Sequence, residues 1–386
     1  MSPRLSPKWF LAVTVLVIVA GLVVVDQREA RAGEVNPSTG YKVLDPIRHG
    51  NLTVFPVVTS KSYPTGEFLT LDEGLRSGEV VVTEAGNVQG LIRRHNLPSV
   101  RHDGPQVNRL VLVNNSKRPL LLLAGEIVSG GKQDRVIGKD RIVPAESDPV
   151  DLSVFCVEPG RWVATTEHFG ASEQIYAGKQ GSAAAPPMAL MAQPSVRARA
   201  MADKDQNEVW AEVRKQREAV ADTVAVTGAA PALTSELKST TSYAKVNEND
   251  EVRKQVDAVA RPIEEHYHSL IRQLRDRNAV GVVVAVNGRI IWADVFASTD
   301  LLEKYWPKLV RSYASEAFVT RAKEVDVSLS RAQAFLEDLD GRRETIENEP
   351  GVYRHTEVSG DGFKAFALTS LLPKTGFEVH VAKMAE

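Results

Sequence analysis

One run of residues, GVVVAV-NG-RIIWADVF at 281–296, constrains the fold of this chain more than any other. Two apolar segments meet there at Asn287-Gly288. An Asn-Gly pair is typical of a two-residue type I′ hairpin, because both central residues need positive φ. We therefore predict two antiparallel strands, at 281–286 and 289–296. At least part of the core must then be built on an antiparallel sheet.

Helical patterns surround this hairpin. Apolar residues recur at steps of three and four from Val252 to Leu274, which predicts a long amphipathic helix with a kink at Pro262. Asp300 and Glu303 have capping-box spacing and predict a second helix that begins there. A third helix is expected at 330–339, before a hairpin that turns at 359–362. These elements predict a mixed hairpin-and-helix C-terminal body over residues 251–386.

The region 40–176 consists mainly of strand-like runs. Apolar segments at 52–58, 79–83, 88–93, 109–113, 119–123 and 150–157 are separated by turn residues. Asn114-Asn115-Ser116 lies between two of them and predicts a hairpin, since Asn tolerates positive φ. We expect an antiparallel β-sandwich-like or barrel-like N-terminal body. The fold class expected for the whole chain is α+β.

Composition changes between these two bodies. Residues 177–206 and 226–250 are rich in small and polar residues and lack a sustained hydrophobic period, which predicts linkers. A short helix at 207–221 lies between them and places Val209, Trp210 and Val213 on one side. We therefore expect residues 177–250 to be a low-complexity linker that contains one short helix.

The first 32 residues indicate export. Arg4 and Lys8 precede an apolar run at 9–25, and Ala30 and Ala32 have the A-x-A spacing of a signal peptidase site. The run is long for a signal peptide and short for a spanning helix, so two outcomes stay open. Either residues 1–32 are a signal peptide cleaved near Ala32, or they are retained as an N-terminal membrane anchor. Both outcomes predict a periplasmic or cell-surface location.

Charge and cysteine content exclude several classes of protein. The net charge is −2, and the first 32 residues carry four basic and two acidic side chains, which leaves −4 for the rest. This balance lacks the basic footprint of a nucleic-acid-binding protein. Cys156 is the single cysteine, so no intrachain disulfide can form. No P-loop, dinucleotide-binding, zincin or nucleophile-elbow motif is present, so no metal site is predicted and no cofactor is identified.

Polar side chains concentrate at 126–162, between two strand-like runs. Glu126 and Glu158 are candidate general bases there, because a carboxylate beside bound ligand can accept a proton. The candidate ligand-binding residues are Lys132, Gln133, Asp134, Arg135, Arg161 and Trp162. Arginine suits bidentate recognition of an anion, and tryptophan can stack on a ring. The alternative is an ion-paired, solvated strand edge without a ligand.

Two further residues invite a functional interpretation. Asp294 is a third candidate catalytic carboxylate, since alternation by two places it on one strand face with Ile290, Trp292 and Phe296. It is expected to pair with Arg289 or a helix residue, to cap a loop, or to be an acid of raised pKa in a pocket. Cys156 lies on an apolar strand face, so we expect a buried core residue rather than a nucleophile.

Five blocks of sequence resemble a known family. GEIVSGGKQDRVIGKDRIVPA, VFCVEPGRW, NEVWAEV, GVVVAVNGRIIWADVF and LLEKYWPKLVRSYASEA look like the ARG-and-rhodanese-phosphatase-superfamily-associated protein family. The resemblance runs from about Leu44 to the C-terminus. The family is named from gene neighbourhoods that contain ADP-ribosylglycohydrolase-like proteins. It therefore implies ADP-ribose or nucleotide chemistry as one expectation, and it assigns no catalytic residue.

Two functions are expected from the sequence. The first is an exported binding or scaffold domain, tethered to the membrane if residues 9–25 are retained, with a polar site in 126–162 for a small anionic or sugar ligand. The alternative is a hydrolase-like enzyme that acts on an ADP-ribose, nucleotide or sugar ligand. The two differ in whether a carboxylate faces bound ligand in a concave pocket.

Export gives the first testable prediction. A fusion of residues 1–40 to a reporter that is active only outside the cytoplasm should be active, because of the basic–apolar–A-x-A order. Replacing Ala32 by a bulky residue should convert any released protein into an anchored one, as seen by fractionation. An inactive, cytoplasmic reporter would contradict export.

Overall fold

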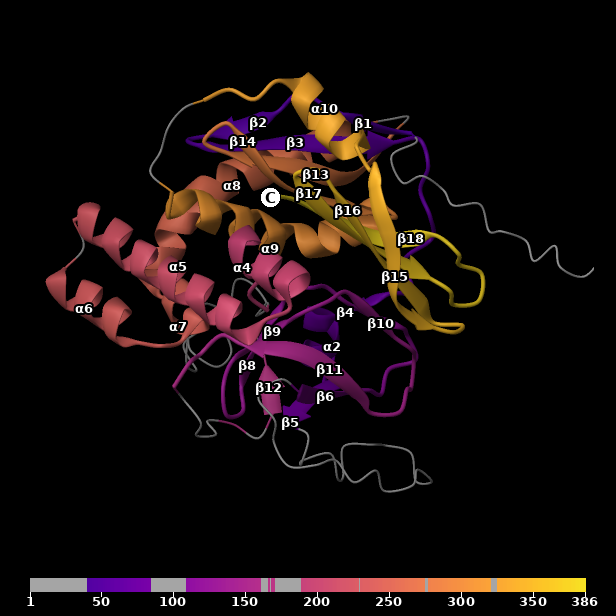
Figure 1. Ribbon diagram of the computed structural model, residues 1–386, viewed down its shortest axis with the longest axis horizontal. Coiled ribbons are helices and arrows are strands. Elements are labelled where there is room, and N and C mark those ends of the chain that lie inside the picture. Colours follow the sequence, from indigo (N-terminus) through magenta and orange to yellow (C-terminus); the bar gives the residue numbers. More distant parts are fainter. Residues whose placement is uncertain are drawn as a thin grey trace, which may run out of the picture. The chain divides into compact units, whose positions relative to one another are not determined.

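The computed structural model describes residues 40–84, 109–160, 166, 168–170, 189–228, 230–274, 277–320 and 325–386 (Figure 1). Residues 40–386 form one unit by their contacts. The expected signal or anchor segment, the linker part 177–188 and the expected strand at 88–93 lie outside the described residues. Within the described ranges, no helix is long and apolar enough to cross a membrane.

A large antiparallel sheet contains nine of the described strands, in the order β1-β3-β13-β14-β18-β17-β16-β15, with β2 also paired to β3. These strands are β1 (Tyr41–Val43), β2 (Ile47–His49), β3 (Leu52–Thr59), β13 (Asn278–Val286), β14 (Arg289–Phe296), β15 (Gly341–Glu349), β16 (Tyr353–Gly360), β17 (Phe363–Ser370) and β18 (Glu378–Ala385). Strands from both ends of the described chain therefore share one sheet. The expected α+β class is confirmed.

The pairing of β3 with β13 differs from the expected division into two bodies. β3 was assigned to the N-terminal body, but it lies antiparallel to β13 along its whole length, from Leu52 opposite Val286 to Thr59 opposite Asn278. Every residue of β3 is buried. Residues 41–59 thus belong structurally with the C-terminal strands.

The expected hairpin at Asn287-Gly288 is confirmed. Both residues have positive φ, 49° and 74°, as a type I′ turn requires. The register shifts between Val284 and Ala285, which lie opposite Trp292 and Ile290. This bulge turns Ile290 to the sheet face opposite Trp292, so the expectation that both lie on one face is wrong.

Helices cover both faces of the central strands (Figure 1). α8 (Asp250–Gln273) and α9 (Thr299–Phe318) pack on the face that carries Trp292 and Phe296, and α10 (Leu329–Glu337) packs on the other. The expected capping box at Asp300 is wrong. Ser298 caps α9 instead, because its Oγ accepts a hydrogen bond from the Leu301 amide at 3.1 Å.

The second β layer is a closed barrel with the strand order β11-β6-β5-β12-β8-β9, all pairs antiparallel. Its described strands are β5 (Val80–Glu84), β6 (Arg109–Asn114), β8 (Ile127–Gly130), β9 (Arg135–Ile137), β11 (Val150–Cys156) and β12 (His168–Gly170). Apolar side chains such as Leu112, Leu152 and Val154 fill its interior. As expected, alternate residues of β11 are buried.

The hairpin expected around Asn114-Asn115-Ser116 is wrong. β7 (Leu120–Leu122) does not pair with β6 but with β10 (Arg141–Val143) and, in parallel, with β4 (Leu69–Thr70). The Asn114 amide donates to the carbonyls of Arg118 and Pro144, both at 2.9 Å. Asn114 therefore stabilises a connection that leads from the barrel to another sheet. The same Asn-rich turn residues would be expected in a hairpin, so the sequence does not distinguish the two connections.

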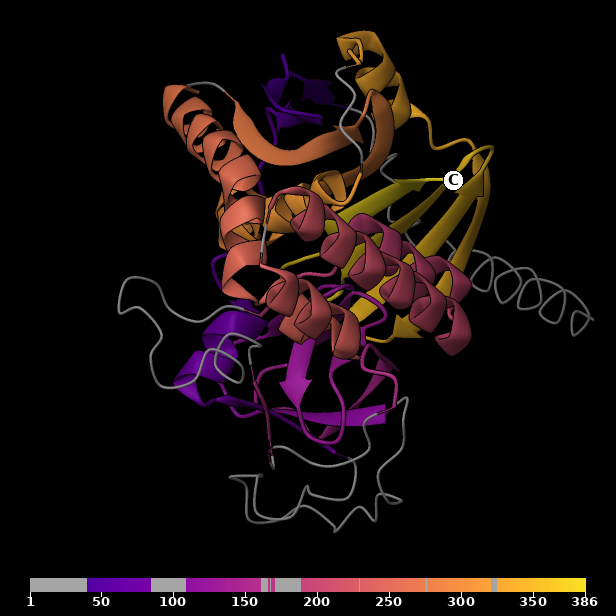
Figure 2. The same cartoon turned by 90° about the vertical axis from the view of Figure 1, so that its left-hand side faces the viewer.

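The described part of the expected linker is largely helical. It forms α4 (Pro194–Ala198), a π-helix η2 (Arg199–Asp203), α5 (Gln206–Val226), α6 (Pro231–Ser239) and α7 (Tyr243–Asn247) (Figure 2). Ala192, Val196 and Ala200 are buried against the barrel residues Ile127 and Val136. The prediction of a low-complexity linker is thus wrong for 189–206. Small residues there permit close packing rather than preventing order.

Gly281 in β13 provides a test of the central pairing. A Cβ at this position would lie 2.4 Å from the main-chain O of Asp294 and 2.8 Å from Cα of Val295. Gly281→Ala should lower the free energy of unfolding by about 1–3 kcal/mol in urea titrations, because backbone cannot move aside cheaply. Gly66→Ala is the control, since nothing lies within 4 Å of its Cβ. Equal stability of both variants would contradict the pairing.

Candidate functional site

The barrel brings three of the predicted ligand-binding and catalytic residues together. Gln133 donates through Nε2 to the Glu158 carbonyl at 3.1 Å, and the Asp134 amide donates to Oε2 of Glu158 at 3.2 Å. The Asp134 carboxylate accepts hydrogen bonds from Ser242 Oγ at 2.9 Å and from the Gly130 amide at 3.1 Å. These contacts join the barrel to the segment before α7.

Arg135 and the backbone of Lys132 are also engaged in the barrel. Arg135 is fully buried, and its guanidinium donates to the Gln133 carbonyl at 2.8 Å. The Lys132 amide donates to Oε1 of Glu84 at 3.0 Å. Arg161 and Trp162 lie outside the described residues. None of the described residues at 132–158 lines any of the three cavities considered below, so their role as a ligand site stays a prediction.

Cys156 is a core residue, as expected. It is fully buried, and burial raises the pKa of its thiol. Its Sγ accepts a hydrogen bond from the Glu158 amide at 3.4 Å. His168, a histidine that could serve as a base, lies exposed on β12. A thiol held neutral in this way is a poor nucleophile.

Asp294 is the centre of a buried ionic network. Arg197 of α4 donates to both of its carboxylate oxygens, each at 3.0 Å, and Tyr313 of α9 donates to Oδ2. His380 of β18 lies between two carboxylates, with Nε2 3.1 Å from Asp294 and Nδ1 2.6 Å from Asp140. The side chains of these ion-paired residues have no exposed surface.

The charges of this network set its protonation. Burial by itself would raise the pKa of Asp294, but the charge of Arg197 and the hydrogen bonds from His380 hold it far below its usual range. Burial would lower the pKa of His380, but Asp140 and Asp294 raise it to about 9. Asp294 is therefore an ionised partner of a helix residue. The interpretation as an acid of raised pKa is wrong.

A second buried network contains Glu126. Lys308 of α9 donates to Oε1 of Glu126 and, at 2.6 Å, to Asp72 of α2 (Leu71–Ser77). The other oxygen of Glu126 accepts from the Leu123 amide at 2.8 Å. Burial, and then the charge of Asp72, raise the pKa of Glu126 although Lys308 opposes them. Two carboxyl groups thus share one buried ammonium.

This network forms the inner wall of a cavity of about 470 Å³ between α2, residues 189–191, α8 and α9. Asp72 and Lys308 line it, whereas Glu126 lies behind Lys308. Its basic and acidic lining residues are equal in number: Arg76, Arg253, Lys304, Lys308 and Arg311 against Asp72, Glu73, Glu248, Asp257 and Glu264. Met191, Val256 and Pro307 add apolar surface.

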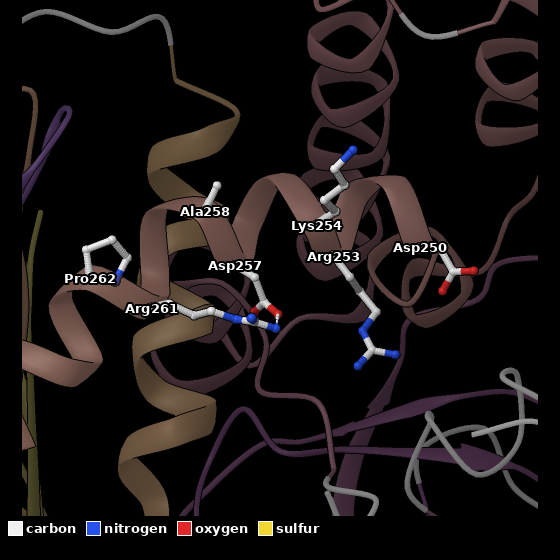
Figure 3. A pocket seen from close by; sticks show the side chains of 7 residues that line it. All are labelled: Asp250, Arg253, Lys254, Asp257, Ala258, Arg261 and Pro262. Carbon is white, nitrogen blue, oxygen red and sulfur yellow. Dashed lines mark hydrogen bonds and ion pairs between the residues drawn. The ribbon is translucent and has the colours of Figure 1, made fainter. Parts of the chain in front are cut away.

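Most of these charges are paired across the cavity wall. Lys304 lies 3.0 Å from Glu73, and Arg311 lies 2.9 Å from Asp257. A groove of about 530 Å³ along α8 shares Arg253 and Asp257 with the cavity and therefore adjoins it. Figure 3 shows the groove, in which Asp257 is joined to Arg261 along the helix.

Comparison with known proteins identifies one family. Residues 40–383 match the ARG and Rhodanese-Phosphatase-superfamily-associated Protein domain. The chain belongs to this family. No curated protein and no solved structure matches it. The matched range includes the barrel, the nine-stranded sheet and both buried networks, so the domain of this family is the combined unit.

Several residues of the Asp294 and Glu126 networks were not predicted from the sequence. Arg197 lies in the expected linker, and His380 lies in a strand that was not anticipated. A pattern in the sequence could have indicated Lys308. Polar residues recur at steps of four on α9, at Lys304, Lys308 and Ser312, and so share one helix face. Within the described residues, no group of three or more His, Cys, Asp or Glu side chains could hold a metal ion.

The His380 network predicts a pH dependence for this domain. A folded-state pKa of about 9, above the usual 6.5, means that the stabilisation is complete below pH 6.5 and is lost as the pH rises to 9. The loss should be roughly 3 kcal/mol of unfolding free energy. Denaturant titrations of wild type and His380→Gln from pH 6 to about pH 10 should show this slope in wild type only.

The exposed His266 provides the control for that comparison. His266→Gln should keep the slope of wild type. Comparing proteins at each pH also removes the contribution of Lys383, whose burial lowers its pKa to about 8 and acts in the opposite direction. A slope that survives in His380→Gln would contradict a charged His380.

Proposed function

We propose that this chain is an exported binding protein and that its ligand occupies the cavity between α2, α8 and α9. The observation that carries the proposal is the position of a buried ion-paired lysine, Lys308, in the wall of a cavity large enough for a small molecule. Burying three ionisable groups costs desolvation free energy, which supports a role for them beyond stability.

A polyhydroxylated, sugar-like ligand fits this lining best. The balanced charges disfavour a strong anion, because four of the five cations already lie within ion-pair distance of a carboxylate, namely Arg253, Lys304, Lys308 and Arg311. A hydroxyl group both donates and accepts hydrogen bonds, so it can bridge a guanidinium and a carboxylate without bringing charge. The apolar surface of Met191, Val256 and Pro307 suits the C–H face of a sugar ring.

The binding function is favoured over catalysis by the position of the carboxyl groups. Glu126, whose pKa is raised, has no exposed surface and lies behind Lys308. Asp72 lines the cavity, but its oxygens already accept from Lys308 and, at 2.5 Å, from the Ala189 amide. A general base must reach the proton that it removes. The alternative, a hydrolase acting on ADP-ribose, a nucleotide or a sugar, rests on this Asp72–Lys308–Glu126 cluster.

Export remains part of the proposal because of the first 32 residues. The basic flank, the apolar run at 9–25 and the A-x-A spacing support it. A protein outside the cytoplasm meets sugars and cell-surface glycans more readily than cytoplasmic nucleotides. The location and the lining of the cavity therefore favour the same ligand class.

A thermal-shift screen of the full chain tests this function. Sugars should raise the melting temperature more than nucleotides, ADP-ribose or divalent metals do, since a specific ligand stabilises the native state. At a hundredfold excess over Kd the stabilisation should be about 2.7 kcal/mol. Product formation from any bound sugar or nucleotide, followed by chromatography, would favour the hydrolase instead.

Variants locate the effect in the cavity. Lys304→Gln and Arg311→Gln should weaken binding by about 1.5–3 kcal/mol each, the contribution of a hydrogen bond to a charged group. Lys42→Gln, an exposed substitution on β1, is the matched control and should bind like wild type. Unchanged binding in both cavity variants would place the ligand elsewhere.

A further inference from the structure

A second cavity, of about 500 Å³, lies between α4, η2, α5, α9 and the strands β14 and β18. It shares no lining residue with the α2–α8–α9 cavity. Part of its wall is apolar and is formed by Pro194, Ala198, Ile290, Ile291 and Met384. This cavity is therefore independent of the proposed sugar site.

Glu316 of α9 is the polar feature of this cavity. One of its oxygens, Oε2, accepts hydrogen bonds from the Ser195 amide at 3.0 Å and from Ser195 Oγ at 2.8 Å. Its other oxygen, Oε1, has no hydrogen-bond partner in the described ranges of the chain. A carboxyl group that lines a cavity with one oxygen unused can accept a ligand donor.

A second carboxylate lies close to this one. Gln216 donates through Nε2 to Ser195 Oγ at 3.0 Å and to Oε1 of Glu212 at 2.6 Å. Ser195 and Gln216 therefore connect Glu316 to Glu212, and both carboxyl groups line the cavity. Burial, with a contribution from Glu212, raises the pKa of Glu316.

The cations around the cavity are occupied by other groups. Arg199 pairs with Asp203 at 2.8 Å, and Lys215 pairs with Glu212 at 3.2 Å. Arg289 donates to the carbonyl of Glu386 at 3.0 Å. Among the described residues, no basic side chain lies within ion-pair distance of Glu316. Glu316 thus has no direct ion-pair partner in the described ranges, although Lys215 acts on its charge from farther away.

Trp292 completes the wall of this cavity. It is almost completely buried, and its indole N–H has almost no accessible surface and no hydrogen-bond partner. The ring of Trp292 therefore adds flat apolar surface to the wall, while its N–H is not accessible to a ligand.

We infer that this cavity binds an organic amine, with the ammonium group at Oε1 of Glu316 and the apolar part against Ile291, Met384 and Ala198. An ammonium group supplies both the donor and the counter-charge that Glu316 lacks. An anion would be repelled by Glu212 and Glu316. A neutral molecule of the same shape gains the apolar contacts without the ion pair.

Isothermal titration calorimetry on the full chain tests this inference with three probes of similar shape. Phenethylamine should bind at least about tenfold more tightly than phenethyl alcohol, and phenylacetate should not bind. The comparison separates charge from apolar contact. Failure of phenethylamine to bind, or equal binding of the alcohol, would overturn the inference.

Variants assign the binding to Glu316. Glu316→Gln keeps the shape of the side chain and removes its charge, so the affinity for phenethylamine should fall at least about tenfold. Glu265→Gln, an exposed substitution on α8, is the control and should leave the affinity unchanged. Unchanged affinity in Glu316→Gln refutes the assignment.

A steric variant covers the case in which Glu316→Gln fails to fold. Ala198 is partly exposed and lines the cavity, so Ala198→Leu should be accommodated and should fill part of the space. It should abolish phenethylamine binding while the melting temperature stays close to that of wild type. Retained binding in a folded Ala198→Leu protein would show that the amine binds elsewhere. The sugar response of the first cavity should be unaffected in either variant.

Discussion

The charge of Asp294 is the constraint on which the combined unit depends. Arg197 comes from α4, Tyr313 from α9, and His380 from β18, while Asp140 lies between β9 and β10. Each of these groups is too costly to bury alone, and breaking such a pair typically costs about 3–5 kcal/mol. The barrel, the helical segment and the sheet therefore cannot separate without exposing or orphaning a charge. This network therefore links the three layers at one buried point.

Local signals in the sequence predicted many of the elements but not their partners. Asn287-Gly288 predicted a hairpin correctly because type I′ geometry is a property of two adjacent residues. The pairing of β3 with β13 depends on residues far apart along the chain, and the residues near Leu52 carry no local pattern that predicts it. The segment 189–206 was misjudged for a different reason. Its alanines lack hydrophobic periodicity, yet their small size lets α4 pack closely enough for Arg197 to reach Asp294.

In the candidate site, too, the sequence identified a residue but not its long-range partner. Glu126 was recognised as a notable carboxylate, but its partner Lys308 lies 182 residues away. Pairing over that distance is decided by the tertiary fold, so the sequence predicted a cluster with its own neighbours at 132–135. Those neighbours are hydrogen-bonded within the barrel instead. A polar residue repeated at helical spacing on an otherwise apolar helix was the signal that could have identified Lys308.

That repeat on α9 explains why two cavities adjoin one helix. Lys304, Lys308, Ser312 and Glu316 follow one another at steps of four and so lie along one stripe. Lys304 and Lys308 hold α2 through Glu73 and Asp72, whereas Ser312 and Glu316 hold the segment 189–198 through the Ala192 carbonyl and Ser195. A polar stripe cannot pack as tightly against its neighbours as an apolar one, since each charge needs space and a partner. Cavities with polar walls lie at both ends of the stripe, so residues that hold the helices together also line the two proposed sites.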